Sequence, residues 1–202
     1  LSQASAHPVT FKGGNAFYAT RRHGMVRFEA NHTFSRRLSA GAAYANFDLP
    51  GADLEAGLAM GSLLAYRRNG KGSQANAYLT LGGGYVLFPD GTGNPAGTGG
   101  LQLDFETKRL YTAIMGSSLL MSPFGYNGPT EDLYGVQGRI GMAPYVAEFD
   151  QLQAWLVLQA GTTTAEDGFM VSPILRFFYR TVLWELGTSQ NGHPWIQLMV
   201  HY

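Results

Sequence analysis

The stretch Trp195-Ile196-Gln197-Leu198-Met199-Val200-His201-Tyr202 decides the fold of this chain. Every second residue from Ile196 to Tyr202 is apolar, and the polar Gln197 and His201 lie between them. A period of two places these two sets on opposite faces of a β-strand. The same alternation recurs along most of the chain, and transmembrane barrels alternate in this way between lipid and lumen. We therefore predict an all-β fold, an antiparallel up-and-down β-barrel that spans the bacterial outer membrane.

The bulk composition fits such a barrel and argues against several other classes. Of the 202 residues, 45% are hydrophobic and 14% are charged, and the mean hydropathy is −0.08. No run approaches the roughly 18 to 20 apolar residues that a membrane helix requires. The 27 glycines suit curved strands. The absence of cysteine fits an oxidising envelope, and the net charge of zero argues against a nucleic-acid partner.

The alternating segments predict about twelve strands in one domain that covers residues 1–202. We expect both termini in the periplasm and a flexible N-terminal segment over residues 1–8. The predicted strands cover residues 9–20, 24–34, 38–47, 53–67, 73–87, 100–106, 109–121, 132–146, 151–161, 168–178, 180–188 and 194–202.

The connections between these strands predict an asymmetry that is typical of such barrels, with short periplasmic turns and longer external loops. Phe88 to Gly99 and Ser122 to Glu131 are expected as long external loops, whereas Thr107-Lys108 and Ala147 to Asp150 are expected as short inner turns. Basic residues such as Arg36 and Arg67 cluster at the inner turns and acids cluster at the outer loops. Solvated loop charges explain this division, and so does binding of the outer acids to cations that bridge lipopolysaccharide.

The apolar faces are predicted to contact the outer-membrane lipid. A soluble β-sandwich with the same residues as its core is the alternative. The expected lipid-facing residues are Val26, Phe28, Ala30 and Phe34 in the second strand, Leu54, Ala56, Leu58, Met60, Leu64 and Tyr66 in the fourth, and Leu152, Ala154, Leu156 and Leu158 in the ninth. The expected interfacial aromatic girdles consist of Phe34, Phe47, Tyr66, Tyr85, Phe105, Tyr111, Tyr134, Phe177, Tyr179, Trp184 and Tyr202.

The opposite faces are polar, of mixed sign, and are predicted to line the lumen. Buried charges of opposite sign pair with each other, so the lumen is either closed by arginine–carboxylate bridges or left as a narrow water-filled channel. The predicted lumen and selectivity residues are Arg27, Glu29, Asn31, Glu55, Gln74, Asn76, Gln102, Asp104, Glu106, Gln137, Arg139, Gln153, Arg176, Glu185 and Gln197. Further residues assigned to the same faces are Asp53, Tyr78, Gln151, Trp155, Gln159 and His201.

Catalytic and metal-binding patterns are weak in this sequence. His32 near Ser35 is the nearest approach to the serine and histidine of a lipid hydrolase, and a third member at a defined spacing is missing. Met199 and His201 share one face of the last strand, but the methionines as a group are expected on both faces as packing residues. We therefore predict neither a catalytic site nor a metal or cofactor.

The overall pattern resembles small outer-membrane β-barrels of Gram-negative bacteria, especially the twelve-stranded monomeric class that includes oligogalacturonate- and sialic-acid-specific channels. The resemblance is architectural and rests on the repeated alternation, the loop asymmetry and the ending Leu198–Tyr202. The sequence departs from the acidic-sugar channels because Arg27, Arg139 and Arg176 are offset by at least as many acids. It also ends in Tyr202 where the commonest terminal residue is Phe.

The resemblance and the lumen residues together lead us to expect a narrow channel for a small polar solute or ion. One alternative is a closed structural barrel that binds envelope or surface protein partners. The other is a lipid-active outer-membrane enzyme, which His32 and Ser35 would have to serve.

Overall fold

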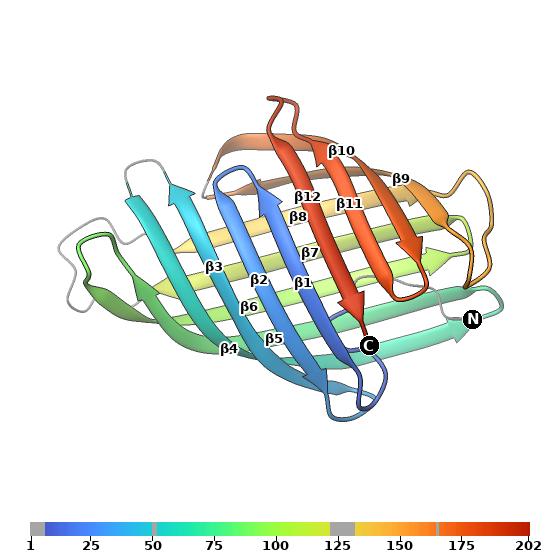
Figure 1. The fold of residues 1–202 in the computed structure, drawn as a ribbon, viewed down its shortest axis with the longest axis horizontal. Helices are drawn as coiled ribbons and strands as arrows, with labels where there is room; N and C mark the ends of the chain where they lie inside the picture. The colour runs from blue at the N-terminus through green and yellow to red at the C-terminus, as the bar shows by residue number, and fades with distance from the viewer. Residues whose placement is uncertain (1–6, 50–51, 122–131, 165) are drawn as a thin grey trace.

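A computed structural model describes residues 7–49, 52–121, 132–164 and 166–202. These residues form twelve β-strands that are joined in chain order (Figure 1). The strands are β1 (Asn15–Arg22), β2 (Met25–Thr33), β3 (Leu38–Leu49), β4 (Ala52–Gly70), β5 (Ser73–Leu87), β6 (Gly93–Thr107), β7 (Leu110–Met121), β8 (Leu133–Met142), β9 (Gln153–Thr163), β10 (Glu166–Tyr179), β11 (Val182–Thr188) and β12 (Pro194–His201).

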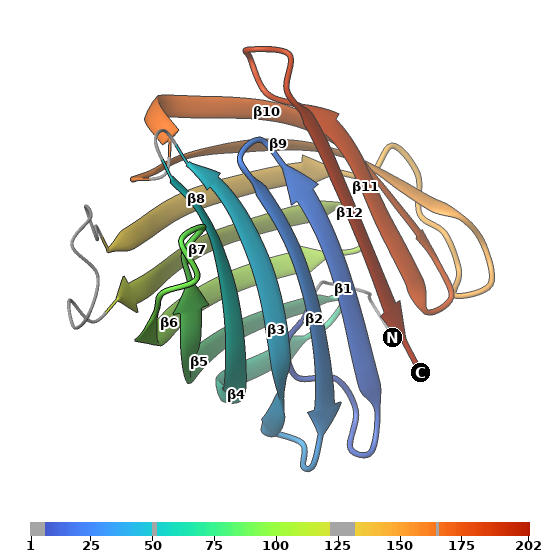
Figure 2. The same ribbon diagram turned by 60° about the vertical axis from the view of Figure 1, so that its left-hand side comes forward.

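The twelve strands close into one antiparallel barrel, which confirms the predicted fold class. Each strand pairs with its neighbours in sequence, and β1 pairs with β12 from Ala16↔His201 to Arg21↔Ile196. In Figure 1, β1 to β3 lie on the near side and cross β6 to β8 behind them at a steep angle, as the strand tilt of a barrel requires. Figure 2 shows the same closed wall from a second side.

Among the described residues, no helix is long and apolar enough to cross a membrane.

We name the two openings of the barrel by their position relative to the two ends of the chain. The termini end is the opening where β1 begins and β12 ends, and the far end is the opposite opening. At the far end, His23 and Gly24 form the connection between β1 and β2, and Gly24 has a positive φ of 62° that favours glycine. At the termini end, the connections include residues 34–37, 71–72 and 143–152.

Large apolar side chains cover the outside of the wall. Phe28, Ile114, Leu156 and Leu198 are all exposed, and Ile114 keeps 59% of its surface accessible. Because such a contiguous apolar exterior is unfavourable in water, it is the surface that a barrel presents to lipid. The predicted outward faces of the second, ninth and last strands are confirmed.

The fourth strand faces the opposite way from the prediction. Leu54, Ala56, Leu58, Met60 and Leu64 are buried inside the barrel, whereas Asp53 and Glu55 are exposed on the outer surface. The assignment of Asp53 and Glu55 to the lumen is therefore wrong. The pairing with β3 sets this orientation, because Leu54 lies opposite Phe47 and Ala56 lies opposite the buried Ala45.

A β-bulge between Leu64 and Tyr66 changes the orientation of the rest of β4. The extra residue in a bulge shifts the alternation by one position. Leu64 therefore pairs with the buried Tyr78 and points inward, while Tyr66 pairs with Ala77 and is exposed on the outside as predicted. The next residue, Arg67, points into the lumen.

Two predicted girdle aromatics also lie inside the barrel. Tyr111 is buried, and Phe47 packs against the apolar side chains of the lumen. Both residues lie near strand ends, as girdle residues do, but the pairing of their strands turns them inward. Tyr85, Tyr134 and Tyr202 are exposed on the outer surface.

Several strand limits differ from those predicted. The first strand begins at Asn15 and not at residue 9, because residues 7–14 are not part of the barrel wall. The glycine-rich segment expected as a loop from Phe88 to Gly99 is mostly strand, since β6 begins at Gly93. This segment pairs with the glycines of β5, where a Cβ atom on Gly84 would collide with the carbonyl of Gly57.

The predicted loop asymmetry does not hold for the described connections. Residues 143–152, expected to be mostly strand around a short turn, form a long connection at the termini end. Arg109 holds its start through donation to the carbonyls of Ala143 and Pro144, at 3.1 and 3.2 Å. The expected external loop from Ser122 to Glu131 lies outside the described residues.

Candidate functional site

The predicted lumen residues, except Glu55, lie on the inward faces of their strands. They form two levels, a lower level toward the termini end and an upper level that lines a cavity toward the far end. The lower level contains Asn31, Gln74, Asn76, Asp104, Glu106, Gln153, Arg176 and Glu185, and the upper level contains Arg27, Glu29, Gln102, Gln137, Arg139 and Gln197.

Glu185 is the centre of the strongest group of polar contacts. Its fully buried carboxylate accepts from Arg176 Nε at 2.7 Å and from Arg139 Nη1 at 3.1 and 3.2 Å. Trp195 Nε1 also donates to it at 3.3 Å, and Arg139 Nε donates to Gln159 Oε1 at 2.7 Å. These contacts connect the inward faces of five neighbouring strands, β8, β9, β10, β11 and β12. We call these five residues the Glu185 cluster.

Aromatic rings complete the surroundings of the two arginines. The Arg176 guanidinium lies 4.3 Å from the centre of the Tyr111 ring, and the Arg139 guanidinium lies 5.3 Å from that of Trp195. Stacking on a ring face stabilises a guanidinium in a place where water is scarce. This explains why Tyr111 points inward although its sequence position suggested a girdle.

Other lumen charges are paired in smaller groups. Arg27 donates to Glu29 at 2.6 Å, and Asn31 donates to the other oxygen of the same carboxylate at 2.6 Å. On β4 to β6, Asn76 donates to Asp104 at 2.7 Å and accepts from Arg67 Nε at 2.8 Å. Asp104 therefore pairs with amides rather than with an arginine.

Residues 7–14, the N-terminal segment, enter the lumen from the termini end. Val9 is only 1% exposed and packs against Leu64 and Tyr78. The carbonyl of His7 accepts from Tyr18 Oη at 2.6 Å, and the carbonyl of Pro8 accepts from Ser39 Oγ at 2.8 Å. The segment therefore fills lumen space beside the Asp104 group. Residues 1–6 lie outside the described residues.

His7 is buried in this position and precedes the first strand. Its ring stacks on Tyr78 with centres 5.1 Å apart, and Nδ1 lies 3.5 Å from Asp104 Oδ2. Burial and, after it, the nearby positive charge of Arg67 lower the pKa of His7 to about 3. His7 is therefore neutral at pH 7.

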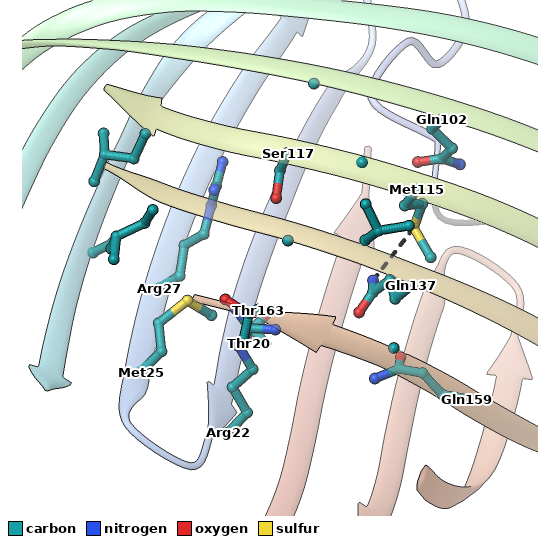
Figure 3. Close-up of a pocket in the computed structure, with 18 of the residues that line it drawn as sticks. Thr20, Arg22, Met25, Arg27, Gln102, Met115, Ser117, Gln137, Gln159 and Thr163 are labelled. Atoms are coloured by element: carbon teal, nitrogen blue, oxygen red, sulfur yellow. Dashed lines mark hydrogen bonds between the residues drawn. The ribbon is translucent and has the colours of Figure 1, made fainter. Parts of the chain in front are cut away.

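Above the Glu185 cluster, the lumen opens into a cavity of about 390 Å³ that we call the vestibule. Figure 3 shows Arg22 and Arg27 on one side of it, with Ser117 and Gln137 on the other. Tyr18, Arg139 and Trp195 line its lower part, where Pro8 of the N-terminal segment also contacts it. The vestibule therefore ends at the Glu185 cluster and the N-terminal segment.

The sequence did not reveal four parts of this site. Arg67 was assigned to a periplasmic turn, and only the bulge brings it inside. Tyr111 was assigned to a girdle, and nothing in the sequence marks Val9 as a lumen residue. The inward apolar face of β4 was assigned to lipid.

The residues considered for catalysis and metal binding make other contacts. Asn15 Oδ1 lies 2.9 Å from His32 Nδ1, whereas Ser35 Oγ accepts from the backbone N–H groups of residues 37 and 38. Met199 is fully buried in a cluster of apolar side chains. Within the described part of the chain, no group of three or more His, Cys, Asp or Glu residues is placed to hold a metal ion.

Comparison with known proteins finds solved structures of similar fold but no protein of similar sequence. No protein-family model matches the chain, and no curated protein matches it in sequence. The solved structure "KdgM porin in complex with disordered oligogalacturonate" is 12% identical, with a TM-score of 0.53 over 94% of this chain and 98% of that chain. A second structure, "KdgM porin", is 11% identical, with a TM-score of 0.52 and the same coverage.

These likenesses show that the chain shares its barrel fold with a porin. The closed antiparallel wall and the apolar exterior have the properties that a membrane-spanning barrel needs. The chain is therefore an outer-membrane β-barrel of twelve strands, as its sequence pattern predicted.

The Glu185 cluster yields a prediction about stability. In Glu185→Gln, two buried guanidinium groups lose their shared counter-charge, so we expect the free energy of unfolding to fall by about 3 kcal/mol. Urea unfolding in lipid vesicles measures this change. The matched control is Glu29→Gln, whose arginine partner is partly exposed, with an expected loss of about 1 kcal/mol or less. Equal losses in the two variants would contradict the central position of Glu185.

The neutral state of His7 yields a prediction about pH. Because the docked His7 has the lower pKa, it binds fewer protons than the undocked residue between pH 3 and 6.5. Docking of the N-terminal segment is then complete above pH 6.5 and weakens by about 1.4 kcal/mol per pH unit below it. Hydrogen-exchange protection of the Thr10 amide, which donates to Thr33 Oγ1 at 3.1 Å, reports the docking. Protection should fall with acidification in the wild type and stay constant in His7→Gln. A pH dependence that His7→Gln retains would contradict the prediction.

Proposed function

We propose that this protein is a narrow outer-membrane channel for a small solute with polar groups. The vestibule is the observation that carries the proposal, because it opens a mixed-charge lumen toward the far end of a membrane-spanning barrel. Arg27, Glu29, Gln102, Gln137 and Gln197 are the residues that a solute would meet there. The predicted lumen residues of the lower level lie deeper and would select the solute at the constriction.

The proposal includes the orientation of the barrel. We place the termini end in the periplasm and the far end outside the cell. Basic residues at the termini end, such as Arg36 and Lys71, and acids at the far end, such as Asp53 and Asp90, support this orientation. In this placement the outer acids face the side where lipopolysaccharide and its bridging cations lie.

The channel is held closed at the termini end in this proposal. Two features support closure, the Glu185 cluster, which narrows the lumen from the wall of β8 to β12, and the N-terminal segment, which lies below the vestibule. The Val9 side chain is the apolar anchor of the segment. Its release would widen the lumen without breaking any strand pairing.

The same two features favour a second function, a permanently closed barrel that serves as a scaffold for envelope or surface partners. The charge pairing around Glu185 supports this alternative, because the one buried carboxylate of the cluster already has its counter-charges. The two functions differ in whether the lumen ever conducts.

Single-channel recording in a planar bilayer separates them. We expect wild-type protein to open rarely, because the N-terminal segment occupies the lumen. A variant that lacks residues 1–10, and Val9→Asp, which places a charge in the apolar contact with Leu64, should conduct steadily. Lys12→Gln, at an exposed position of the same segment, is the matched control and should behave as wild type. Silence of all four proteins, each shown to be folded, would contradict the channel and favour the scaffold.

A further inference from the structure

We propose that the vestibule binds an amphiphilic monoanion, a small molecule with an apolar body and one carboxylate. This inference names the solute class for the proposed channel and rests on that function only for transport, since binding needs the vestibule alone.

One wall of the vestibule is apolar, which is unusual for the inside of a membrane barrel. A cluster of buried apolar side chains runs over the inward faces of β3 to β8, and Ala43, Leu58, Met60, Leu119 and Leu133 of this cluster line the cavity. The lumen of a water-filled channel is instead polar. Water against such a wall is unfavourable, and an apolar ligand that displaces the water is stabilised there.

The charged residues of the vestibule favour an anion. Apart from Arg22, which has an interaction of its own, the described lining contains two arginines, Arg27 and Arg139, and one acid, Glu29. Glu185 lies below and accepts from both Arg139 and Arg176, so one carboxylate is shared between two guanidinium groups. Among Arg27, Arg139, Arg176, Glu29 and Glu185 the surplus is one positive charge, which one carboxylate of a ligand would balance.

Arg27 joins the charged and apolar parts of the vestibule. Its Nη2 donates to Glu29 at 2.6 Å and approaches Met60 Sδ, a member of the apolar cluster, at 3.4 Å. The Arg27 side chain keeps 34% of its surface accessible although it is paired. A carboxylate bound to Arg27 therefore has the apolar wall directly beside it, and the rest of the same molecule can cover Met60 and Leu58.

The size of the vestibule limits the ligand. A volume of 390 Å³ equals that of about thirteen water molecules in the liquid and lies within the range of small-molecule pockets. A short-chain aryl carboxylate such as 4-phenylbutyrate fits within this volume. A purely polar sugar acid such as galacturonate would leave the apolar wall without a partner and lose its own hydrogen bonds to water there.

Calorimetric titration of the full-length protein in lipid nanodiscs tests the proposal, with empty nanodiscs as the blank. We expect 4-phenylbutyrate to bind about tenfold more tightly than either 4-phenylbutanamide, which lacks the charge, or galacturonate, which lacks the apolar body. Comparable or tighter binding of galacturonate, or no binding of 4-phenylbutyrate to the folded barrel, would overturn the proposal.

Two pairs of variants assign the binding to the vestibule. Leu58→Gln, in the lining, should weaken 4-phenylbutyrate binding at least about fivefold. Leu54→Gln, on the same face of β4 but outside the lining, should leave it unchanged. Arg27→Gln should lower the affinity for the carboxylate to that for the amide, whereas Arg21→Gln, on the outer face of β1, should have no effect. A Leu58→Gln barrel that is folded and binds as wild type would overturn the proposal.

The binding experiment and the conductance experiment can give negative results independently of each other. If 4-phenylbutyrate binds as expected but no protein conducts, the amphiphile site stands and the channel is wrong. If the protein that lacks residues 1–10 conducts but 4-phenylbutyrate neither binds nor reduces the current, the channel stands and this inference is wrong.

Discussion

The pairing of β1 with β12 is the constraint on which the rest of the structure depends. In a bilayer, a strand edge with unpaired N–H and C=O groups is very costly, so the sheet has to close on itself. The register from Ala16↔His201 to Arg21↔Ile196 closes it. Once the ring is closed, the alternation of each strand decides which side chains meet lipid and which meet the lumen, and the tilt of the strands sets the width available inside.

The inside of the barrel then has to satisfy groups that water reaches poorly. The Glu185 carboxylate accepts hydrogen bonds from Arg139 and Arg176. The Arg176 guanidinium also stacks on the Tyr111 ring, and the Arg139 guanidinium stacks on the Trp195 ring. The N-terminal segment fills the remaining space at the termini end. Toward the far end the lumen stays open, with an apolar wall on one side and arginines on the other. The vestibule is thus what the closed ring and the paired charges leave unfilled, and this is where recognition of a solute is concentrated in our account.

Sequence pattern predicted the fold and most of the inward-facing residues, because a period of two is a strong signal when one face is clearly polar. It failed on β4, where Leu58 and its neighbours looked suited to lipid and Glu55 looked suited to a lumen. Alternation separates the two faces of a strand but does not show which face is outside. The orientation of β4 is set by its pairing with β3, through pairs such as Ala56↔Ala45. The bulge that turns Arg67 inward and the position of Val9 depend on three-dimensional packing, and the local sequence carries no mark of either. The solute class that we propose could not be predicted from the sequence for the same reason, because the apolar wall is the inward face of β4 and its neighbours.

Closure of the ring by β1 and β12 is the central claim, and disulfide cross-linking tests it most directly, because the chain has no cysteine of its own. Ala19 and Leu198 are direct partners across this pair, so Ala19→Cys with Leu198→Cys should form a cross-link within one molecule in lipid vesicles under mild oxidation. The control Ala19→Cys with Leu156→Cys, on the non-adjacent β9, should form none within a molecule. A cross-link that forms only between molecules, or equally in the control pair, would contradict the closed twelve-stranded barrel.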